Sequence, residues 1–152
     1  MKEKRVSESY AEQVQILTQA NLNGYSRLFG GQLMEWIDIV AAVVARRHSE
    51  CSVTTAVVDM LEFKRPAYAN DTIIIKGKIT YAGKTSMEIK VETFVEALSG
   101  EKTLINTAYL VMVALDENDR PTAVPGLIIE SDEEKNEYSS ALLRKERRLM
   151  CK

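Results

Sequence analysis

Hydrophobic residues recur with two different periods along the chain, and each period is typical of a different secondary structure. Across residues 30–48 the apolar side chains occupy nearly every side of a helical wheel, and no Pro or Gly follows the two opening glycines. The segment ends in basic residues, which complement the dipole at the carboxyl end of a helix. We therefore predict one long helix here, buried on most of its circumference.

Five other segments alternate apolar and polar residues and are rich in β-branched side chains, as strands are. One precedes the helix at residues 10–17, and four follow it, at residues 53–63, 72–81, 85–97 and 103–115. The breaks at 82–84 and 98–101 are short enough for tight antiparallel hairpins. We expect the later strands to follow one another as an antiparallel meander.

The composition changes near residue 130, and residues 131–152 form a predicted helical tail beyond a single domain of residues 1–130. Ser131 is a suitable N-cap, and the acidic start and basic end of the tail suit the helix dipole without any ligand. An apolar helix ahead of an antiparallel sheet predicts that the sheet wraps around the helix, which is an α+β architecture. The outer face and the edges of that sheet stay open, so we expect association with a second copy.

Length and charge exclude several classes of protein. The chain has 152 residues, enough for one core, and its 20 basic and 22 acidic side chains give a net charge of −2, which argues against a nucleic-acid binder. No apolar run approaches the ~20 residues that span a bilayer. Two distant cysteines, Cys51 and Cys151, fit neither a disulfide framework nor a zinc site, so we expect a cytoplasmic location. The single His48 argues against Ser-His-Asp chemistry and most catalytic zinc sites, and its place at the helix end suits a partner for the dipole.

Asp38 interrupts the apolar middle of the predicted helix. At about 100° per residue it lies on the side of Met34, Glu35, Ala41 and Ala42. A carboxylate among small and apolar groups can serve as a general base. Alternatively, Asp38 and Glu35 form a narrow solvated stripe, or Asp38 caps a neighbouring backbone group.

The helix start and two polar turns offer further candidates. The N–H groups at Gly30 and Gly31 can bind an anion or a developing oxyanion, although paired glycines also serve as an ordinary helix entry. Asn23 with Gly24 predicts a turn, and an orienting role for Asn23 needs other support. The predicted hairpin after Gly83 carries one cation and two hydroxyls, those of Lys84, Thr85 and Ser86. These groups can bind a phosphate, or they can simply form the polar tip of the hairpin.

Three motifs, in this order, resemble one known family. They are NGYSRLFGGQLMEWID at 23–38, VTTAVVDMLEF at 53–63 with Pro66 after it, and GKTSMEI at 83–89. Over about residues 13–134 the chain resembles the hotdog-fold acyl-CoA thioesterases of the YciA and brain acyl-CoA hydrolase type. The resemblance implies a hotdog fold, in which an antiparallel sheet wraps around a long central helix, in agreement with the order of elements above.

The resemblance assigns a role to the loop before the helix. Asn23 stands six residues before Phe29, where the family has its active-site Asn, and it is expected to place water or the thioester carbonyl. Asn21 matches part of the same motif with two more residues before Phe29, so it stays an alternative. Ser26 departs from the family, which commonly has Gly at this position.

Asp38 stands seven residues after Gly31, at the position of the family's catalytic Asp. The resemblance implies that Asp38 acts as a general base on water or attacks the thioester directly, while N–H groups near Gly31 stabilise the oxyanion. No metal and no cofactor are expected. Substrate contacts are expected from Phe29 and Gly30 and, toward the phosphates of coenzyme A, from Arg65, Lys84, Thr85 and Ser86.

The resemblance also implies an assembly and an activity. In the family, the Asp and the Asn of one site come from different protomers of a dimer, and dimers often form a trimer of dimers, so a homohexamer is expected. The predicted enzyme hydrolyses acyl-CoA to a free carboxylic acid and coenzyme A. Two alternatives stay open: a hotdog protein that only binds acyl-CoA as an effector, and a hotdog dehydratase, although His48 lies at the wrong end of the helix for the latter.

Overall fold

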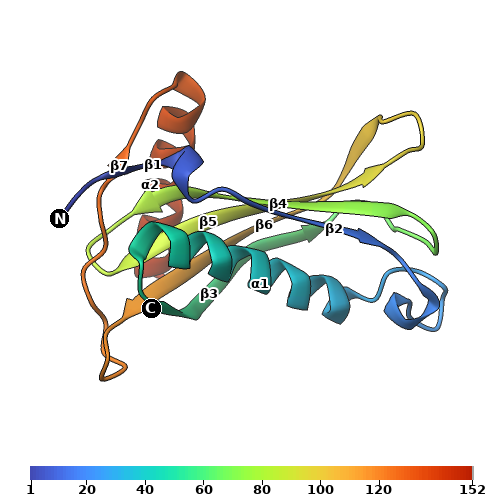
Figure 1. Cartoon of the computed structure of the whole chain (residues 1–152), viewed down its shortest axis with the longest axis horizontal. Helices are drawn as coiled ribbons and strands as arrows, with labels where there is room; N and C mark the ends of the chain where they lie inside the picture. The colour runs from blue at the N-terminus through green and yellow to red at the C-terminus, as the bar shows by residue number, and fades with distance from the viewer. Residues whose placement is uncertain (152) are drawn as a thin grey trace.

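Two long helices and five long strands make up most of the molecule in the computed structural model, which describes residues 1–151 (Figure 1). The helices are α1 (Gly30–Ser49) and α2 (Asp132–Met150), and the long strands are β2 (Ala11–Ile16), β3 (Ser52–Phe63), β4 (Thr72–Ala82), β5 (Ser86–Glu96) and β6 (Lys102–Leu115). Short elements complete the fold: β1 (Lys4–Arg5), β7 (Leu127–Ile128) and the 3-10 helices η1 (Val6–Glu8) and η2 (Gln19–Asn21). The α+β class, the helix predicted at 30–48 and the five predicted strands are confirmed. Within residues 1–151, no helix combines the length and hydropathy needed to cross a bilayer.

The five long strands form one antiparallel sheet in the order β2-β4-β5-β6-β3. The prediction of a meander holds for β4, β5 and β6 but is wrong for β3, which lies beside β6 at one edge. The segment after β3 does not form a hairpin with β4, because its backbone groups bond to the segment between β2 and α1. The carbonyl oxygen of Ala67 accepts from the N–H of Leu28, and the N–H of Asn70 donates to the carbonyl oxygen of Leu17, both at 2.8 Å. These bonds lead the chain across to β4, next to β2.

α1 lies across one face of the sheet, and this inner face holds the core (Figure 1). The side chains of Ile37 and Val44 are fully buried there. At Gly77 of β4 a Cβ atom would lie 2.7 Å from Cγ1 of Val40, so this close approach of helix and strand requires glycine. The predicted burial of α1 is incomplete, however, because one stripe of the helix faces outward. That stripe includes the exposed side chains of Glu35, Ile39 and Arg46.

α2 covers part of the opposite, outer face of the sheet (Figure 1). Arg144 of α2 donates two hydrogen bonds to the carboxylate of Glu88 on β5, at 2.7 and 2.9 Å, and Glu88 is only 2% exposed. Arg148 donates to Oδ2 of Asp59 on β3 at 2.9 Å. The outer face is therefore less open than predicted, and these two basic residues of the tail do more than complement a helix dipole.

The carboxyl end of α1 is covered by segments from both ends of the chain. Nζ of Lys4 donates to the carbonyl oxygen of Arg47 at 2.9 Å. Next to it His48 is fully buried, with its Nε2 2.7 Å from the carbonyl oxygen of Pro125. Burial lowers the pKa of His48, and this effect outweighs the hydrogen bond to Pro125, which raises it. His48 is thus a neutral core residue rather than the charged dipole partner expected from its position.

Candidate active site

Asp38 lies beside the open stripe of α1, where a residue of β3 holds it. Oγ1 of Thr55 donates a hydrogen bond to Oδ1 of Asp38 at 2.6 Å and lies 3.4 Å from Sδ of Met112. The register of β3 shifts between Thr55 and Val57, so Ala56 is the extra residue of a β-bulge, a feature that redirects neighbouring side chains. The bond from Thr55 uses one carboxylate oxygen of Asp38, and the other can accept a proton from water.

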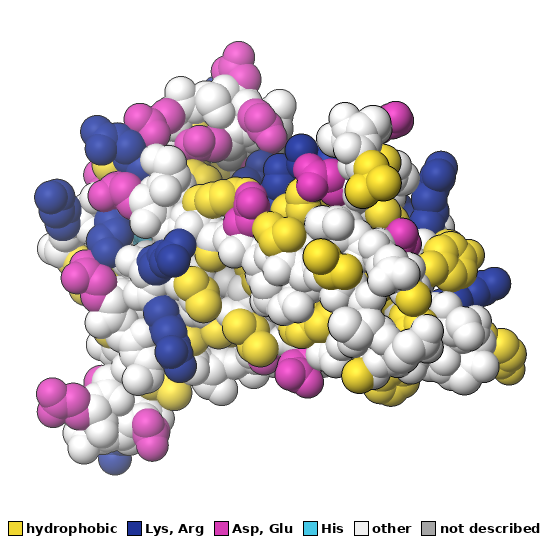
Figure 2. Space-filling view, turned by 45° about the vertical axis from the view of Figure 1, so that its right-hand side comes forward, with side chains coloured by type: hydrophobic (Ala, Val, Ile, Leu, Met, Phe, Trp, Pro, Cys, Tyr) yellow, Lys and Arg dark blue, Asp and Glu magenta, His cyan; other side chains and the backbone are white. Residues whose placement is uncertain are grey.

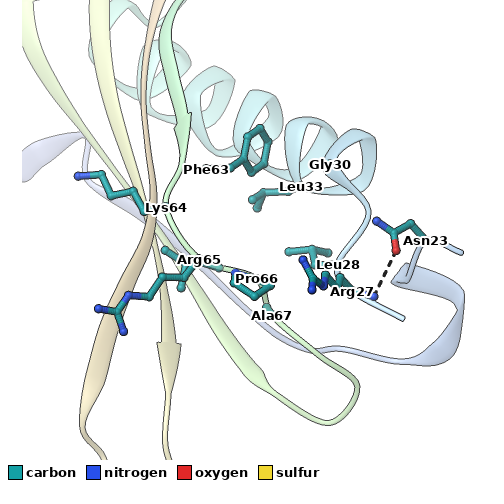
Figure 3. A pocket seen from close by; sticks show the side chains of 11 residues that line it. Asn23, Arg27, Leu28, Gly30, Leu33, Phe63, Lys64, Arg65, Pro66 and Ala67 are labelled. Atoms are coloured by element: carbon teal, nitrogen blue, oxygen red, sulfur yellow. Dashed lines mark hydrogen bonds between the residues drawn. The ribbon is translucent and has the colours of Figure 1, made fainter. Parts of the chain in front are cut away.

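Asn23 and the start of α1 line a separate cavity of about 370 Å³ (Figure 3). The cavity brings together three of the predicted site residues, Asn23, Gly30 and Arg65. Much of its lining is apolar, from Leu28, Leu33, Phe63, Pro66, Ala67 and Ile105. A concave, mainly apolar surface with a few polar groups is typical of a small-molecule site.

Asp38 does not line this cavity. It follows Gly31 by seven residues, which places it about 10 Å further along the axis of α1. On the neighbouring strand, Phe63 lies at the Gly30 end and Thr55 at the Asp38 end, so α1 and β3 run in opposite directions. One protomer therefore carries the candidate site as two separate groups. The Asn23 group consists of Asn23, Arg65 and the start of α1, and the Asp38 group consists of Asp38 and Thr55.

The loop before α1 uses its two candidate asparagines differently. Oδ1 of Asn23 accepts from the backbone N–H groups of two following residues, at 2.8 and 3.3 Å, so its Nδ2 is left to donate outward. Asn21 instead uses both ends inside the protein, because its Oδ1 accepts from Thr18 and its Nδ2 donates to Gln32. This geometry favours Asn23. In the same loop Ser26, where the family commonly has Gly, adopts a φ of 60°, a conformation that favours glycine.

The start of α1 has unpaired donors framed by two aromatic rings. The first N–H groups of any helix lack internal acceptors, and Phe29, the N-cap residue here, has no side-chain oxygen to cap them. A Cβ atom on Gly31 would lie 2.7 Å from Cε2 of Phe29, so Gly31 allows that ring to pack over the helix start. A Cβ atom on Gly30 would lie 3.7 Å from Cζ of Phe63. These N–H groups can donate to an oxyanion in an apolar setting.

The residues predicted to bind phosphate lie at opposite ends of the sheet. Arg65 follows β3 beside the cavity, and Figure 3 shows its side chain and that of Lys64 extending away from Asn23. Lys84, Thr85 and Ser86 lie at the β4–β5 hairpin, close to the Thr55 end of β3, because the residue after Ser86 and Thr55 both pair with Met112. One protomer therefore does not bring Arg65 together with the hairpin.

Sequence comparison connects this arrangement to thioester hydrolases. Residues 25–98 match the profile of the family described as Thioesterase superfamily. The uncharacterized acyl-CoA thioester hydrolase YkhA of Bacillus subtilis (strain 168) is 37% identical over 123 residues, which are 80% of this chain and 72% of YkhA. The chain belongs to the thioesterase superfamily. The predictions of this family and of a thioester hydrolase are thereby confirmed.

Two solved structures are similar to this chain over nearly its whole length. The acyl-CoA hydrolase of Staphylococcus aureus, solved with butyryl coenzyme A, coenzyme A and coenzyme A disulfide, has a TM-score of 0.93 and 34% identity, over 97% of this chain and 91% of that one. An apo-hexameric acyl-CoA thioesterase has a TM-score of 0.94 and 34% identity, over 99% of this chain and 97% of that one. The predicted hotdog fold is confirmed by these neighbours.

The S. aureus hydrolase has also been solved with an Asn, an Asp or a Thr replaced by Ala. In that protein the Asn precedes the Asp by 15 residues, and the Asp precedes the Thr by 17 residues. Asn23, Asp38 and Thr55 have the same two spacings here. The sequence motifs pointed to Asn23 and Asp38 but not to Thr55, because a threonine in an alternating strand is unremarkable until the fold places it against Asp38.

Proposed function

We propose that this chain is an acyl-CoA thioesterase in which Asp38, Thr55, Asn23 and the start of α1 carry out the reaction. The observation that carries the proposal is the 2.6 Å bond from Thr55 to Asp38. The spacing of Asn23, Asp38 and Thr55, shared with the replaced residues of the S. aureus hydrolase, supports it. These groups supply a base, a donor and an oxyanion site, so the proposed reaction uses no metal and no cofactor.

The thioester carbonyl accepts hydrogen bonds from the N–H groups near Gly31, while Nδ2 of Asn23 positions the carbonyl or the attacking water. Asp38 removes a proton from water as the water oxygen bonds to the carbonyl carbon, and the N–H groups stabilise the negative charge that develops on the carbonyl oxygen. The tetrahedral intermediate then breaks its C–S bond. Coenzyme A leaves as a thiolate, which takes a proton, and the carboxylic acid is released.

Asp38 can also act as the nucleophile. Its carboxylate then bonds to the carbonyl carbon and expels the thiolate, which leaves a mixed anhydride for water to hydrolyse. Rapid-quench measurements separate the two routes, because the nucleophilic route releases thiol before free acid and the general-base route releases both together.

The substrate contacts follow from the same placement. Phe29 and Gly30 flank the thioester at the helix start, and the apolar lining of the cavity suits an acyl chain or the pantetheine arm. Arg65 at one end, and Lys84, Thr85 and Ser86 at the other, are the proposed contacts to the phosphates of coenzyme A.

The site is proposed to be completed by a second copy of the chain. Asp38 cannot reach a carbonyl bound at Gly31 of its own rigid helix, about 10 Å away. β3 is an edge strand, so its outer N–H and C=O groups can pair with another strand. Apolar side chains on β3 and on the open stripe of α1 are also exposed: those of Ile39, Val58, Met60 and Phe63. Figure 2 shows apolar side chains gathered across the middle of one face of the molecule.

A two-fold axis near Asp59 determines which residues of the two protomers face each other in the proposed dimer. Asp59 lies midway between Thr55 and Phe63 on β3, so antiparallel pairing of two β3 edges around it sets Thr55 of one protomer opposite Phe63 of its partner. Each Asp38 group then lies beside the partner's Asn23 group, and the dimer has two complete sites. A hexamer, a trimer of such dimers, is the proposed assembly, supported by the hexameric neighbour. The cytoplasmic location stays a prediction from the sequence.

Thiol release from a panel of short to long acyl-CoA esters tests the activity. We expect turnover by the wild type and its loss in Asp38→Asn, with the oligomer intact by size-exclusion chromatography. Asp119→Asn is the matched control, because it makes the same chemical change at an exposed turn after β6 and should keep full activity. Binding of every ester without cleavage by the wild type would instead establish the effector function, and full turnover by Asp38→Asn would exclude the role given to Asp38.

Mixing two inactive variants tests the composite site. Co-expressed Asn23→Ala and Asp38→Asn chains form hybrid dimers with one intact and one doubly altered site, so random mixing should restore about a quarter of the wild-type activity. Activity that stays at the level of the separate variants would show that each protomer holds a complete site.

A further inference from the structure

A second cavity, of about 170 Å³, lies on the outer face of the sheet between the β4–β5 hairpin and the last turns of α2. Val57 and Val111 supply apolar lining, and Tyr81 and Ser86 lie near the hairpin. From α2 come two basic residues, Lys145 and Arg148, and the apolar Leu149. The cavity thus joins one predicted phosphate contact, Ser86, to cations that the sequence motifs did not point to.

Polar atoms converge at the hairpin side of this cavity. Nζ of Lys145 donates to Oη of Tyr81 at 3.2 Å. A Cβ atom on Gly83 would lie 3.3 Å from that same Oη and 3.4 Å from Oγ of Ser86. Both hydroxyls therefore lie on the same side of Gly83, where a side chain at residue 83 would crowd them. An ammonium group and two hydroxyls on one side of a hairpin can bind an anion.

The charges around the cavity leave Lys145 as the cation available to a ligand. Arg144 is neutralised by Glu88 at 2.7 Å, and Arg148 by Asp59 at 2.9 Å. Within residues 1–151, Lys145 has no carboxylate oxygen within 4.0 Å. These two ion pairs and Lys145 together carry one net positive charge, which favours a negatively charged partner.

We propose that Lys145, with Ser86 and Tyr81, binds a phosphate group of the coenzyme A part of the substrate. This inference rests on the proposed thioesterase function and adds α2 to the substrate-binding residues. Met87, next to Ser86, and Thr55 flank the same residue of β6, so the hairpin lies two strand spacings, about 10 Å, from Thr55. Thr55 faces α1 on the inner side of the sheet, whereas the cavity lies on the outer side, so the pantetheine arm, which separates the thioester from the phosphates, passes around the end of the sheet beside the hairpin.

The test compares two substrates that share one thioester. Butyryl-CoA carries the phosphates, and the N-acetylcysteamine thioester of butyrate does not. For Lys145→Met we expect KM for butyryl-CoA to rise about tenfold, the loss of one charge-assisted hydrogen bond, with kcat unchanged and with no change toward the N-acetylcysteamine ester. Lys135→Met is the matched control, because it removes the same charge from an exposed position at the other end of α2. It should leave both substrates unaffected.

Binding of coenzyme A itself, followed by calorimetry, tests the site without turnover, and Lys145→Met should weaken it about tenfold. Ser86→Ala, which changes no residue of α2, should raise KM for butyryl-CoA in the same selective way. An unchanged affinity, an equal loss toward both substrates, or a selective loss in Arg65→Met with none in Lys145→Met would each overturn the inference. If the wild type binds coenzyme A through Lys145 but cleaves neither ester, the proposed thioesterase function fails and the phosphate site stands.

Discussion

Replacing Thr55 with Val isolates the hydrogen bond that holds Asp38. Valine keeps the branched shape of threonine and removes only the donor, which lies 2.6 Å from Oδ1 of Asp38. A hydrogen bond to a charged group contributes about 1.5–3 kcal/mol. If the bond orients Asp38 in the transition state, its loss corresponds to about a 10- to 150-fold fall in kcat. KM should stay nearly constant, because the hydroxyl contacts Asp38 rather than the substrate.

Thiol release with a chromogenic disulfide measures this change directly. Thr55→Ser restores a hydroxyl in the same position and should recover most of the lost kcat. Urea unfolding of both variants separates a catalytic effect from a loss of folded protein. Because the two residues act as a unit, Thr55→Val combined with Asp38→Asn should be no less active than Asp38→Asn alone. A wild-type kcat in Thr55→Val, or an equal loss in Thr55→Ser, would refute the positioning role of this hydroxyl.

Three further predictions concern stability. Arg144→Met leaves the buried carboxylate of Glu88 without its partner and should lower the free energy of unfolding in urea by about 3–5 kcal/mol, with part of the loss recovered by adding Glu88→Gln. Burial lowers the pKa of His48 below its ordinary 6.5, so its contribution to stability is present above that pH and is lost as the pH falls through the folded-state pKa. His48→Gln should therefore flatten the pH dependence of unfolding below the ordinary pKa of 6.5. Gly77→Ala places a methyl group 2.7 Å from Cγ1 of Val40 and should cost about 1–3 kcal/mol, seen as a lower Tm.

The sequence predicts where the helices and strands of this fold lie better than it predicts which strands pair with one another. Periodicity is local, so the helix at 30–48 and the strands could be located to within one residue at each end. The partner of β3 is not local information. It depends on backbone bonds from the segment after β3 to Leu17 and Leu28, which no spacing along the chain reveals. For the same reason the ion pairs of α2 with Glu88 and Asp59 could not be told from ordinary dipole complementation.

The candidate site divides in the same way. Asp38 could be predicted because a carboxylate conflicts with its apolar surroundings, and Asn23 because a motif fixes its distance from the helix start. Thr55 conflicts with nothing in its strand, since threonine is a common strand residue. Only the register of β3 against α1, adjusted by the bulge at Ala56, makes it a partner of Asp38. A residue that does not suit its own helix or strand can be recognised from the sequence, whereas a contact between residues of two different elements cannot.

The rigidity of α1 connects the chemistry to the assembly. Gly31 and Asp38 belong to one uninterrupted helix, so their separation of about 10 Å is fixed and no loop movement can close it. A reaction that needs both groups at one carbonyl must therefore take one of them from another chain. The edge of β3 and the exposed Ile39 lie between the Asn23 group and the Asp38 group, on the surface that a second copy would cover. On this reasoning, a substitution that separates the protomers, such as Val58→Lys on β3, should abolish turnover while each protomer stays folded and the Thr55 to Asp38 bond stays intact.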